Sequence, residues 1–265
     1  MLTLGLVAPS TDLSARVFGQ DDRKHLSADH DPLSRSAVVL MPTRRNGEVV
    51  TRRYVTGVFT GDCQTIVTVA HLRSLAPNWV EGEFGAAVFF RDRRGVWLRR
   101  TVAPDAIPRR AGRPGPESDF MVLRLAAALK DCAPLTFGRP ATAQGSTLCD
   151  RPALLSMQVP VGRAHAVPTL SERCGVSPWR GGASLIAHDC DLSVGASGGA
   201  LICLGDPQPT AFGLQVARVF ASADSAAAAP ASLARTAPNV ALRYDSDAFL
   251  RAIRATGPAG QIGER

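Results

Sequence analysis

The sequence predicts an all-β, barrel-like fold that ends in one short helix. Short apolar runs recur through the 265 residues, and each is bounded by glycine, proline or polar residues, as strands joined by tight turns are. Hydrophobic residues make up 45% of the chain, which provides for a packed core. None of the apolar runs approaches the roughly 20 residues that a membrane helix requires, so we expect no membrane span.

The first half of the chain contains a series of strand signals and one hairpin. The turn Gly61–Cys63 separates two of these strands, and the second of the pair ends on His71. Residues 99–118 are rich in arginine, proline and glycine and predict an exposed loop. The expected strands are residues 37–41, 55–60, 65–71, 86–90, 96–98 and 120–125.

The second half repeats this pattern after a connector over residues 126–144. Residues 221–238 are rich in alanine and predict a loop insertion. Residues 244–255 have the pattern of a short amphipathic helix, with Ser246 or Asp247 as its cap. The expected strands are residues 146–150, 153–159, 184–189, 199–204 and 210–217.

The net charge of +7 is carried almost wholly by arginine, since lysine occurs only at positions 24 and 130. The arginines are scattered in pairs such as Arg44–Arg45 and Arg109–Arg110. Nucleic-acid binding needs a focused basic surface, so we expect no specific nucleic-acid partner.

The six cysteines are widely spaced, and none forms a Cys-x-x-Cys pair. This spacing gives no indication of a metal site. An even count suggests disulfides and an oxidising compartment, whereas buried free thiols in a cytosolic protein are the alternative. We expect a secreted or periplasmic protein, although the apolar run Met1–Ala8 is short and lacks the basic leader of a signal peptide.

The stretch Gly195–Gly199 places Ser197 between glycines, which suits a tight turn that exposes the hydroxyl. A serine nucleophile needs a histidine base and a group that orients this base. The backbone N–H groups of Gly195 and Ser197 can both point at one developing oxyanion. The alternative is a Gly-Ser loop without chemistry.

Two further residues complete such a set in the chain order His71, Asp119, Ser197. Thr68–His71 resembles the Thr-Ala-Ala-His motif of chymotrypsin-like serine peptidases, and Ser118–Leu125 is similar to their Asp-Ile-Ala-Leu-Leu motif. Gly195–Gly199 resembles their Gly-Asp-Ser-Gly-Gly motif. The nucleophile elbow of α/β-hydrolases is the rival, but it requires a histidine after the serine, and no histidine follows Ser197.

The resemblance is closest to the bacterial branch that includes glutamyl endopeptidases, because Gly19–Arg23 and Cys190–Leu192 look like motifs of that branch. It implies two antiparallel β-barrels of the chymotrypsin type with the active site in the crevice between them. The implied parts are an N-terminal arm (1–34), a first barrel with His71 and Asp119 (35–135), a second barrel with Ser197 (136–243), and a helix with a tail (244–265).

The implied function is that of a secreted, trypsin-like serine endopeptidase that works through a Ser-His-Asp triad and an acyl-enzyme. His71 is then the base, Asp119 orients it, and Gly195 and Ser197 supply the oxyanion hole. No metal and no cofactor are required, the substrates are proteins or peptides, and we expect a monomer. A catalytically inactive binding protein with a peptidase fold stays open as the alternative.

Three residues are implied to bind the substrate. Asp191 stands where trypsin-like enzymes place the acid that pairs with arginine or lysine, although the glutamyl branch carries aspartate there without that preference. Gln215 stands where the glutamyl branch has histidine, and Arg218 could enter the pocket and neutralise Asp191. We expect a slight preference for basic residues.

The resemblance also implies a disulfide pairing and a mode of activation. Chymotrypsin-like enzymes bridge the strands assigned to Cys149 and Cys203. The glycine-rich segment between Cys174 and Cys190 suggests a stapled hairpin, which leaves Cys63–Cys132. Family zymogens mature when a new N-terminal amine pairs with an acid directly before the serine. Ala196 has no charge there, so we expect an oxyanion hole that forms without such a cleavage.

Overall fold

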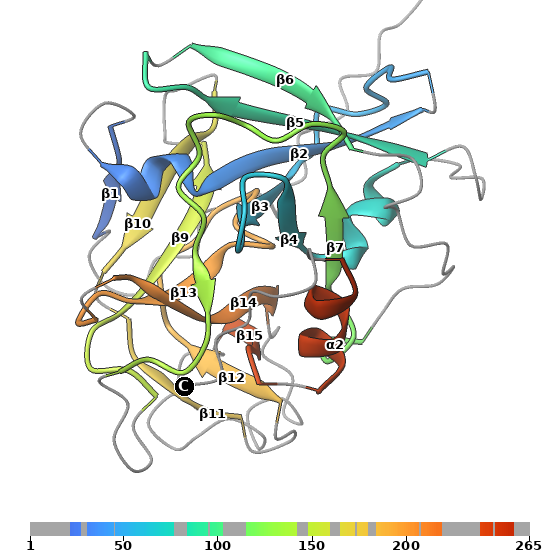
Figure 1. Cartoon of the computed structure of the whole chain (residues 1–265). Helices are drawn as coiled ribbons and strands as arrows, with labels where there is room; N and C mark the ends of the chain where they lie inside the picture. Colours follow the sequence, from blue (N-terminus) through green and yellow to red (C-terminus); the bar gives the residue numbers. More distant parts are fainter. Residues whose placement is uncertain are drawn as a thin grey trace, which may run out of the picture.

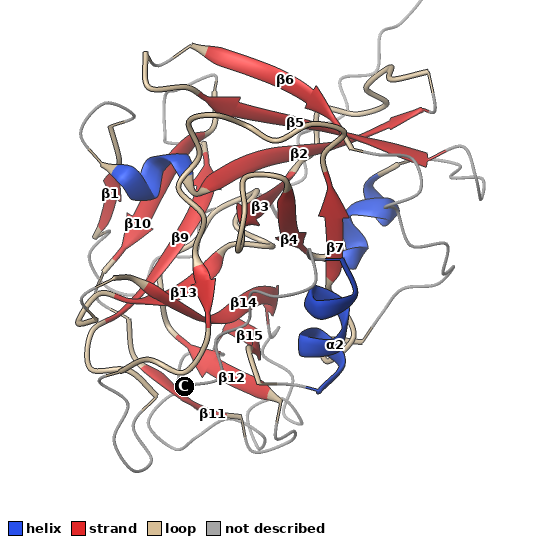
Figure 2. Cartoon of the chain, viewed as in Figure 1, coloured by secondary structure: helices blue, strands red, loops and turns tan. Residues whose placement is uncertain are grey.

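The computed structural model describes residues 22–27, 31–44, 46–76, 84–94, 96–102, 115–141, 148–159, 165–172, 174–179, 184–206, 208–218, 239–245 and 247–256. The described part is built mainly from short strands and ends in one short α-helix, as expected (Figure 2). It also contains two 3-10 helices, η2 (Pro32–Arg35) and η3 (Ala70–Leu75), which were not expected. No helix within it is long and apolar enough to span a bilayer.

The first barrel is a six-stranded antiparallel sheet in the order β6-β5-β2-β3-β4-β7 (Figure 1). A bridge between Val102 and Leu125, just beyond the two outer strands, joins the ends of the sheet and closes the barrel. The strands are β2 (Ala37–Arg44), β3 (Val55–Phe59), β4 (Thr65–Thr68), β5 (Phe84–Arg91), β6 (Trp97–Thr101) and β7 (Met121–Arg124).

The second barrel is a nine-stranded sheet in the order β1-β10-β9-β13-β14-β15-β12-β11, with β8 paired in parallel to β14. Its strands are β1 (Arg23–His25), β8 (Thr136–Phe137), β9 (Pro152–Gln158), β10 (Val167–Ser171), β11 (Val176–Pro178), β12 (Leu185–His188), β13 (Ala200–Cys203), β14 (Thr210–Arg218) and β15 (Asn239–Arg243). The expectation of two antiparallel barrels is therefore confirmed.

Several strands of the second barrel differ from the expectation. Strands β8, β10, β11 and β15 were not expected, and the charged residues of β1, which we assigned to the N-terminal arm, pair with β10. We expected a strand over residues 146–150, but residues 148–150, the part of this range that the structure describes, do not form a strand, so the prediction is wrong there. Pro152, which lacks an N–H group, starts β9 instead. The expected loop insertion at 221–238 lies outside the described residues.

His71 does not end a strand as expected. Strand β4 stops at Thr68, and His71 lies in a short 3-10 helix, η3 (Ala70–Leu75). Val69 and Leu72 are both fully buried, and the three-residue period of a 3-10 turn brings both to the core side. The turn thus leaves His71 only partly covered, with 22% of its side chain exposed.

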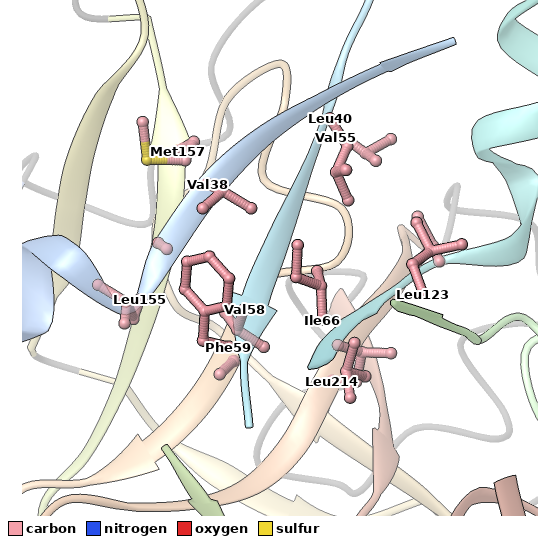
Figure 3. Packing of buried hydrophobic residues seen from close by; sticks show 14 of the residues in the cluster. Val38, Leu40, Val55, Val58, Phe59, Ile66, Leu123, Leu155, Met157 and Leu214 are labelled. Carbon is pink, nitrogen blue, oxygen red and sulfur yellow. The ribbon is translucent and has the colours of Figure 1, made fainter. Parts of the chain in front are cut away.

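Both barrels contribute to one continuous apolar cluster (Figure 3). Val58 and Ile66 of the first barrel and Leu155 and Leu214 of the second barrel are fully buried in it. Gly57 of β3 is required by this packing, since a Cβ there would lie 2.6 Å from Leu40 Cδ1. The shared core fixes the barrels relative to one another, which matters for a site assembled from both.

The C-terminal helix α2 (Asp247–Thr256) packs beside β7 (Figure 1). Phe249 is fully buried and makes edge-on ring contacts with Phe120 and Phe137, with centroids 5.4 and 5.3 Å away. Phe120 directly follows Asp119, so the helix supports the segment that carries this acid. The expected caps, Ser246 and Asp247, lie outside the side chains that the structure describes.

The six cysteines form three disulfides, in the pairs that the family resemblance implies. They are Cys63–Cys132, Cys149–Cys203 and Cys174–Cys190. The first lies in the first barrel and the other two in the second barrel. Cys190 directly precedes Asp191, so the third bridge anchors the segment that leads to Ser197.

Candidate active site

A histidine and an aspartate are paired at the end of the first barrel. His71 Nδ1 lies 2.5 Å from Asp119 Oδ2, and the His71 backbone N–H donates to Asp119 Oδ1 at 2.8 Å. Asp119 is buried, with 8% of its side chain exposed. One carboxylate therefore holds both the ring and the backbone of His71. A ring that donates from Nδ1 keeps a lone pair at Nε2, which can accept a proton.

Strand pairing brings these two residues together. In the register of β4 and β7, Thr68 lies opposite Met121. His71 follows the first of these residues and Asp119 precedes the second, and antiparallel strands bring those flanks to the same end of the sheet. The turn before Asp119 is closed by the Ser118 N–H, which donates to the Gly115 carbonyl at 3.0 Å.

The turn that carries Ser197 is a compact loop, and its conformation requires glycine at position 198. The Gly198 N–H donates to the Gln215 carbonyl at 2.7 Å, and the Ala196 N–H donates to the Ser193 carbonyl at 3.2 Å. Gly198 has a φ of 84°. A Cβ at this position would lie 2.0 Å from the Thr56 carbonyl oxygen, so no other residue fits without a shift of β3.

Thr56 ties this turn to the first barrel. Its backbone N–H donates to the Ser197 carbonyl at 2.8 Å, and its hydroxyl donates to the Gly195 carbonyl at 2.6 Å. The Thr68 hydroxyl donates to the Thr56 carbonyl at 2.6 Å. Since Thr68 leads into the turn of His71, this chain of bonds brings Ser197 and His71 to the same end of the first barrel. Among the described residues, no hydrogen bond joins the Ser197 hydroxyl to His71.

Two backbone donors at the turn have no acceptor among the described residues. Within the described part of the chain, the N–H groups of Gly195 and Ser197 donate to no backbone or side-chain atom. Gly195 is buried and Ser197 is half-buried. Paired amides of this kind, beside a serine hydroxyl, are free to bind an oxyanion. No group of three His, Cys, Asp or Glu residues within the described ranges is arranged to hold a metal ion.

Asp191 is buried and held by the N-terminal arm. Its Oδ2 accepts the backbone N–H of Asp22 at 3.1 Å, and its own N–H donates to the Ser171 hydroxyl at 3.0 Å. The same hydroxyl donates to Asp22 Oδ1 at 2.9 Å. The arm thus reaches the residue that we expected in the specificity pocket, an arrangement that the sequence did not suggest.

Gln215 is also buried, on β14 next to the serine turn. Its side-chain oxygen bonds His188 Nε2, and its side-chain nitrogen donates to the Ala217 carbonyl at 2.9 Å. Burial lowers the pKa of His188 to about 4, against a smaller raising effect of the bond to Gln215. The ring is therefore neutral near pH 7. The side chain of Arg218 lies outside the part that the structure describes.

Other polar residues of the site were not anticipated from the sequence. Gln158 Oε1 accepts the Ser193 hydroxyl at 2.8 Å and Arg23 Nη1 at 3.0 Å. The Tyr54 hydroxyl donates to the Val194 carbonyl at 3.2 Å. The sequence signal for Gln158 is the short alternation of polar and apolar residues around the end of β9, Ser156-Met157-Gln158-Val159. Tyr54 carries no signal, since an aromatic residue before a strand is commonly a core residue.

No family model matches the sequence, and no curated protein matches it either. Among solved structures, a Glu endopeptidase superposes with a TM-score of 0.57 at 14% identity, over 90% of this chain and 98% of that chain. The HtrA-type protease AlgW superposes with a TM-score of 0.52 at 16% identity, over 84% of this chain and 60% of that chain.

The chain has the fold of the chymotrypsin-like serine peptidases. At 14% and 16% identity, the similarity concerns the fold alone. It confirms, for the fold, the family resemblance that the three motifs indicated. The chemistry of this chain has to be argued from its own residues.

Proposed function

We propose that the protein is a serine endopeptidase with Ser197 as nucleophile, His71 as general base and Asp119 as the group that orients His71. The observation that carries this proposal is the pair of hydrogen bonds that His71 donates to Asp119, at 2.5 Å from the ring and 2.8 Å from the backbone. A carboxylate that fixes both the ring and the backbone of one histidine holds a single tautomer and a single orientation.

Each step of the proposed reaction uses groups of the described site. Ser197 Oγ attacks a peptide carbonyl while His71 Nε2 takes its proton, and the N–H groups of Gly195 and Ser197 stabilise the oxyanion by about 3 kcal/mol per donor. The imidazolium, stabilised by Asp119, then protonates the leaving amine. Water hydrolyses the acyl-enzyme by the same route.

The bond between Ser197 and His71 forms, in this proposal, when the substrate is bound. Hydrogen bonds between catalytic groups are often long or poorly aligned in a free enzyme and tighten in the complex with substrate.

Labelling with a fluorophosphonate probe tests this function. We expect wild-type protein to be labelled and to cleave a mixed peptide library, and Ser197→Ala to do neither. Ser118→Ala, which alters an exposed serine beside Asp119, is the matched control and retains both properties. A folded wild-type protein that stays unlabelled would favour the alternative, a binding protein with a peptidase fold.

For specificity, we propose that Asp191 favours arginine or lysine at the cleavage site. A buried carboxylate gains most from a cationic partner. Because the Asp22 N–H already occupies one oxygen, we expect a modest preference. Asp191→Ser should lower kcat/KM for an arginine substrate relative to an alanine substrate by about tenfold. An unchanged ratio would contradict the role of Asp191.

We also propose that the protein acts as a monomer in an oxidising compartment outside the cytosol. All six cysteines are paired, so none is left as a free thiol. Cytosolic proteins are kept reduced, which makes three bridges unusual there. Size-exclusion chromatography with light scattering tests the monomer.

A further inference from the structure

The turn that presents Ser197 contains a β-turn whose central peptide has two possible orientations. The Ala196 N–H donates to the Ser193 carbonyl at 3.2 Å, which makes residues 193–196 the turn. Gly195, at its third position, has a φ of 92°, as a type II turn requires. Type I and type II turns differ by a flip of the central peptide, here between Val194 and Gly195.

This flip decides whether Gly195 can serve the oxyanion. In a trans peptide the C=O and N–H groups point in opposite directions. The described chain has no cis bond. Whatever holds the Val194 carbonyl therefore also fixes the direction of the Gly195 N–H. The neighbouring residue 196 is an alanine, and its methyl group cannot form a hydrogen bond that would hold the turn.

Tyr54 meets this requirement from the first barrel. Its hydroxyl donates to the Val194 carbonyl at 3.2 Å, across 140 residues of sequence. The ring lies against the turn, since a Cβ on Gly195 would be 2.1 Å from Tyr54 Cε2 and 2.4 Å from Cζ. Thr56, two residues further, holds the next carbonyl, that of Gly195, at 2.6 Å. Tyr54, directly before β3, and Thr56, within it, thus hold two consecutive carbonyls of the turn.

The hydroxyl of Tyr54 stays a donor over the whole working range of pH. Burial raises the pKa of Tyr54 to about 12, against a smaller lowering effect of the Val159 backbone N–H. The phenol therefore keeps its proton, and the bond to the Val194 carbonyl does not depend on pH near neutrality.

We propose that Tyr54 is a positioning residue for the oxyanion hole. Its hydroxyl holds the Val194–Gly195 peptide in the type II orientation, so that the Gly195 N–H faces the substrate carbonyl oxygen and needs no N-terminal cleavage to do so. This inference rests on the proposed function, because the hole has a role only if Ser197 attacks a carbonyl.

Tyr54→Phe removes the hydroxyl and keeps the ring against Gly195. We expect kcat to fall about 10- to 100-fold, somewhat less than the loss of a whole oxyanion donor, while KM stays within about twofold. The affinity for a peptide aldehyde, whose adduct is tetrahedral, should fall in proportion to kcat, and Tm should stay close to that of the wild type.

Tyr244→Phe is the matched control, since Tyr244 is the other of the two tyrosines in the chain. Its kinetics should equal those of the wild type. An active wild type with an unaffected Tyr54→Phe would overturn only the role of Tyr54. A fall in Tm, or a rise in KM as large as the fall in kcat, would show a structural role and overturn the proposal. An inactive wild type would overturn the proposed function, and this role with it.

Discussion

At the scale of single residues, the site depends on buried polar groups that each have a specific partner. His188 is the clearest case. It is fully buried, its Nε2 bonds the Gln215 side-chain oxygen, and its Nδ1 accepts the Cys190 N–H at 3.3 Å. A second proton on the ring would place an N–H group at Nδ1, where it would face the Cys190 N–H group and break this hydrogen bond. Protonation of His188 is therefore unfavourable in the folded protein.

This resistance predicts a pH dependence of stability. Burial lowers the pKa of His188 from 6.5 to about 4 in the folded state. Between these values the unfolded chain binds a proton that the folded chain does not, so the free energy of unfolding falls as pH falls. The expected loss is about 1.4 kcal/mol per pH unit, and it ends near pH 4.

Urea unfolding at several pH values between 7.5 and 4 measures this effect, with the His188→Gln variant as the test and His25→Gln, an exposed residue, as the control. The variant at 188 should show a shallower slope than the wild type, whereas the control should not. An equal slope in His188→Gln would assign the pH dependence to other groups.

At the scale of elements, strand β1 connects the N-terminal arm to the substrate side of the second barrel. It pairs with β10, and Asp22 and Arg23 bond Asp191 and Gln158. Removal of residues 1–20 leaves these bonds in place. Removal of residues 1–27 eliminates them, together with strand β1, and the Asp191 carboxylate loses its backbone donor, which is costly.

We therefore expect the shorter truncation to match the full chain in kcat/KM and the longer one to lose at least about tenfold, measured with one peptide substrate. Acetylation of the new terminus in the shorter form should have no effect, because Ala196 offers no acid to an amine. Lys24→Ala, which removes only the exposed ion pair with Glu172, is a control with little expected effect. Equal activity of both truncated proteins would show that the N-terminal arm does not contribute to the active site.

At the scale of the whole molecule, two of the three disulfides have different expected roles. Cys63–Cys132 closes a long loop with a sequence separation of 69, and Cys174–Cys190 closes a short one of 16. Loop entropy predicts a stabilisation of about 4 kcal/mol for the first and about 3 kcal/mol for the second. The second also anchors the segment of Asp191, and the Cys190 carbonyl accepts Asn239 Nδ2 at 3.0 Å.

Replacing both cysteines of one bridge by alanine tests this division. The Cys63/Cys132 variant should lose more stability in urea but keep its kcat/KM. The Cys174/Cys190 variant should lose less stability and more of its kcat/KM. A reversal of this order, or free thiols found in the wild type by mapping under non-reducing conditions, would contradict it.

Much of the fold could be predicted because local sequence patterns determine most of its strands. The apolar runs around Val38, Val58 and Ile66 are buried strands, and the largely apolar run predicted at 153–159 corresponds to β9, because strand formation follows from short-range composition. Strand β1 could not be predicted, since its Arg-Lys-His sequence has no apolar residue, and it forms because the edge of β10 offers unpaired backbone groups. The sequence predicts His71 at the end of a strand, but it lies in the 3-10 helix that follows this strand. The error arose because only the packed core shows that Val69 and Leu72 both face inward.

The sequence by itself determined the all-β, barrel-like class, the order of His71, Asp119 and Ser197, and the glycines that the serine turn requires, whereas the division into two barrels came from the family resemblance of the motifs. These are properties of neighbouring residues and of backbone conformation, which a linear pattern records. The tertiary structure alone decided that Asp22 bonds Asp191 and that Tyr54 bonds the Val194 carbonyl. Such contacts join segments that are distant in sequence. The first lies within the second barrel and the second joins the two barrels, and both form because folding buries polar groups that must then find partners.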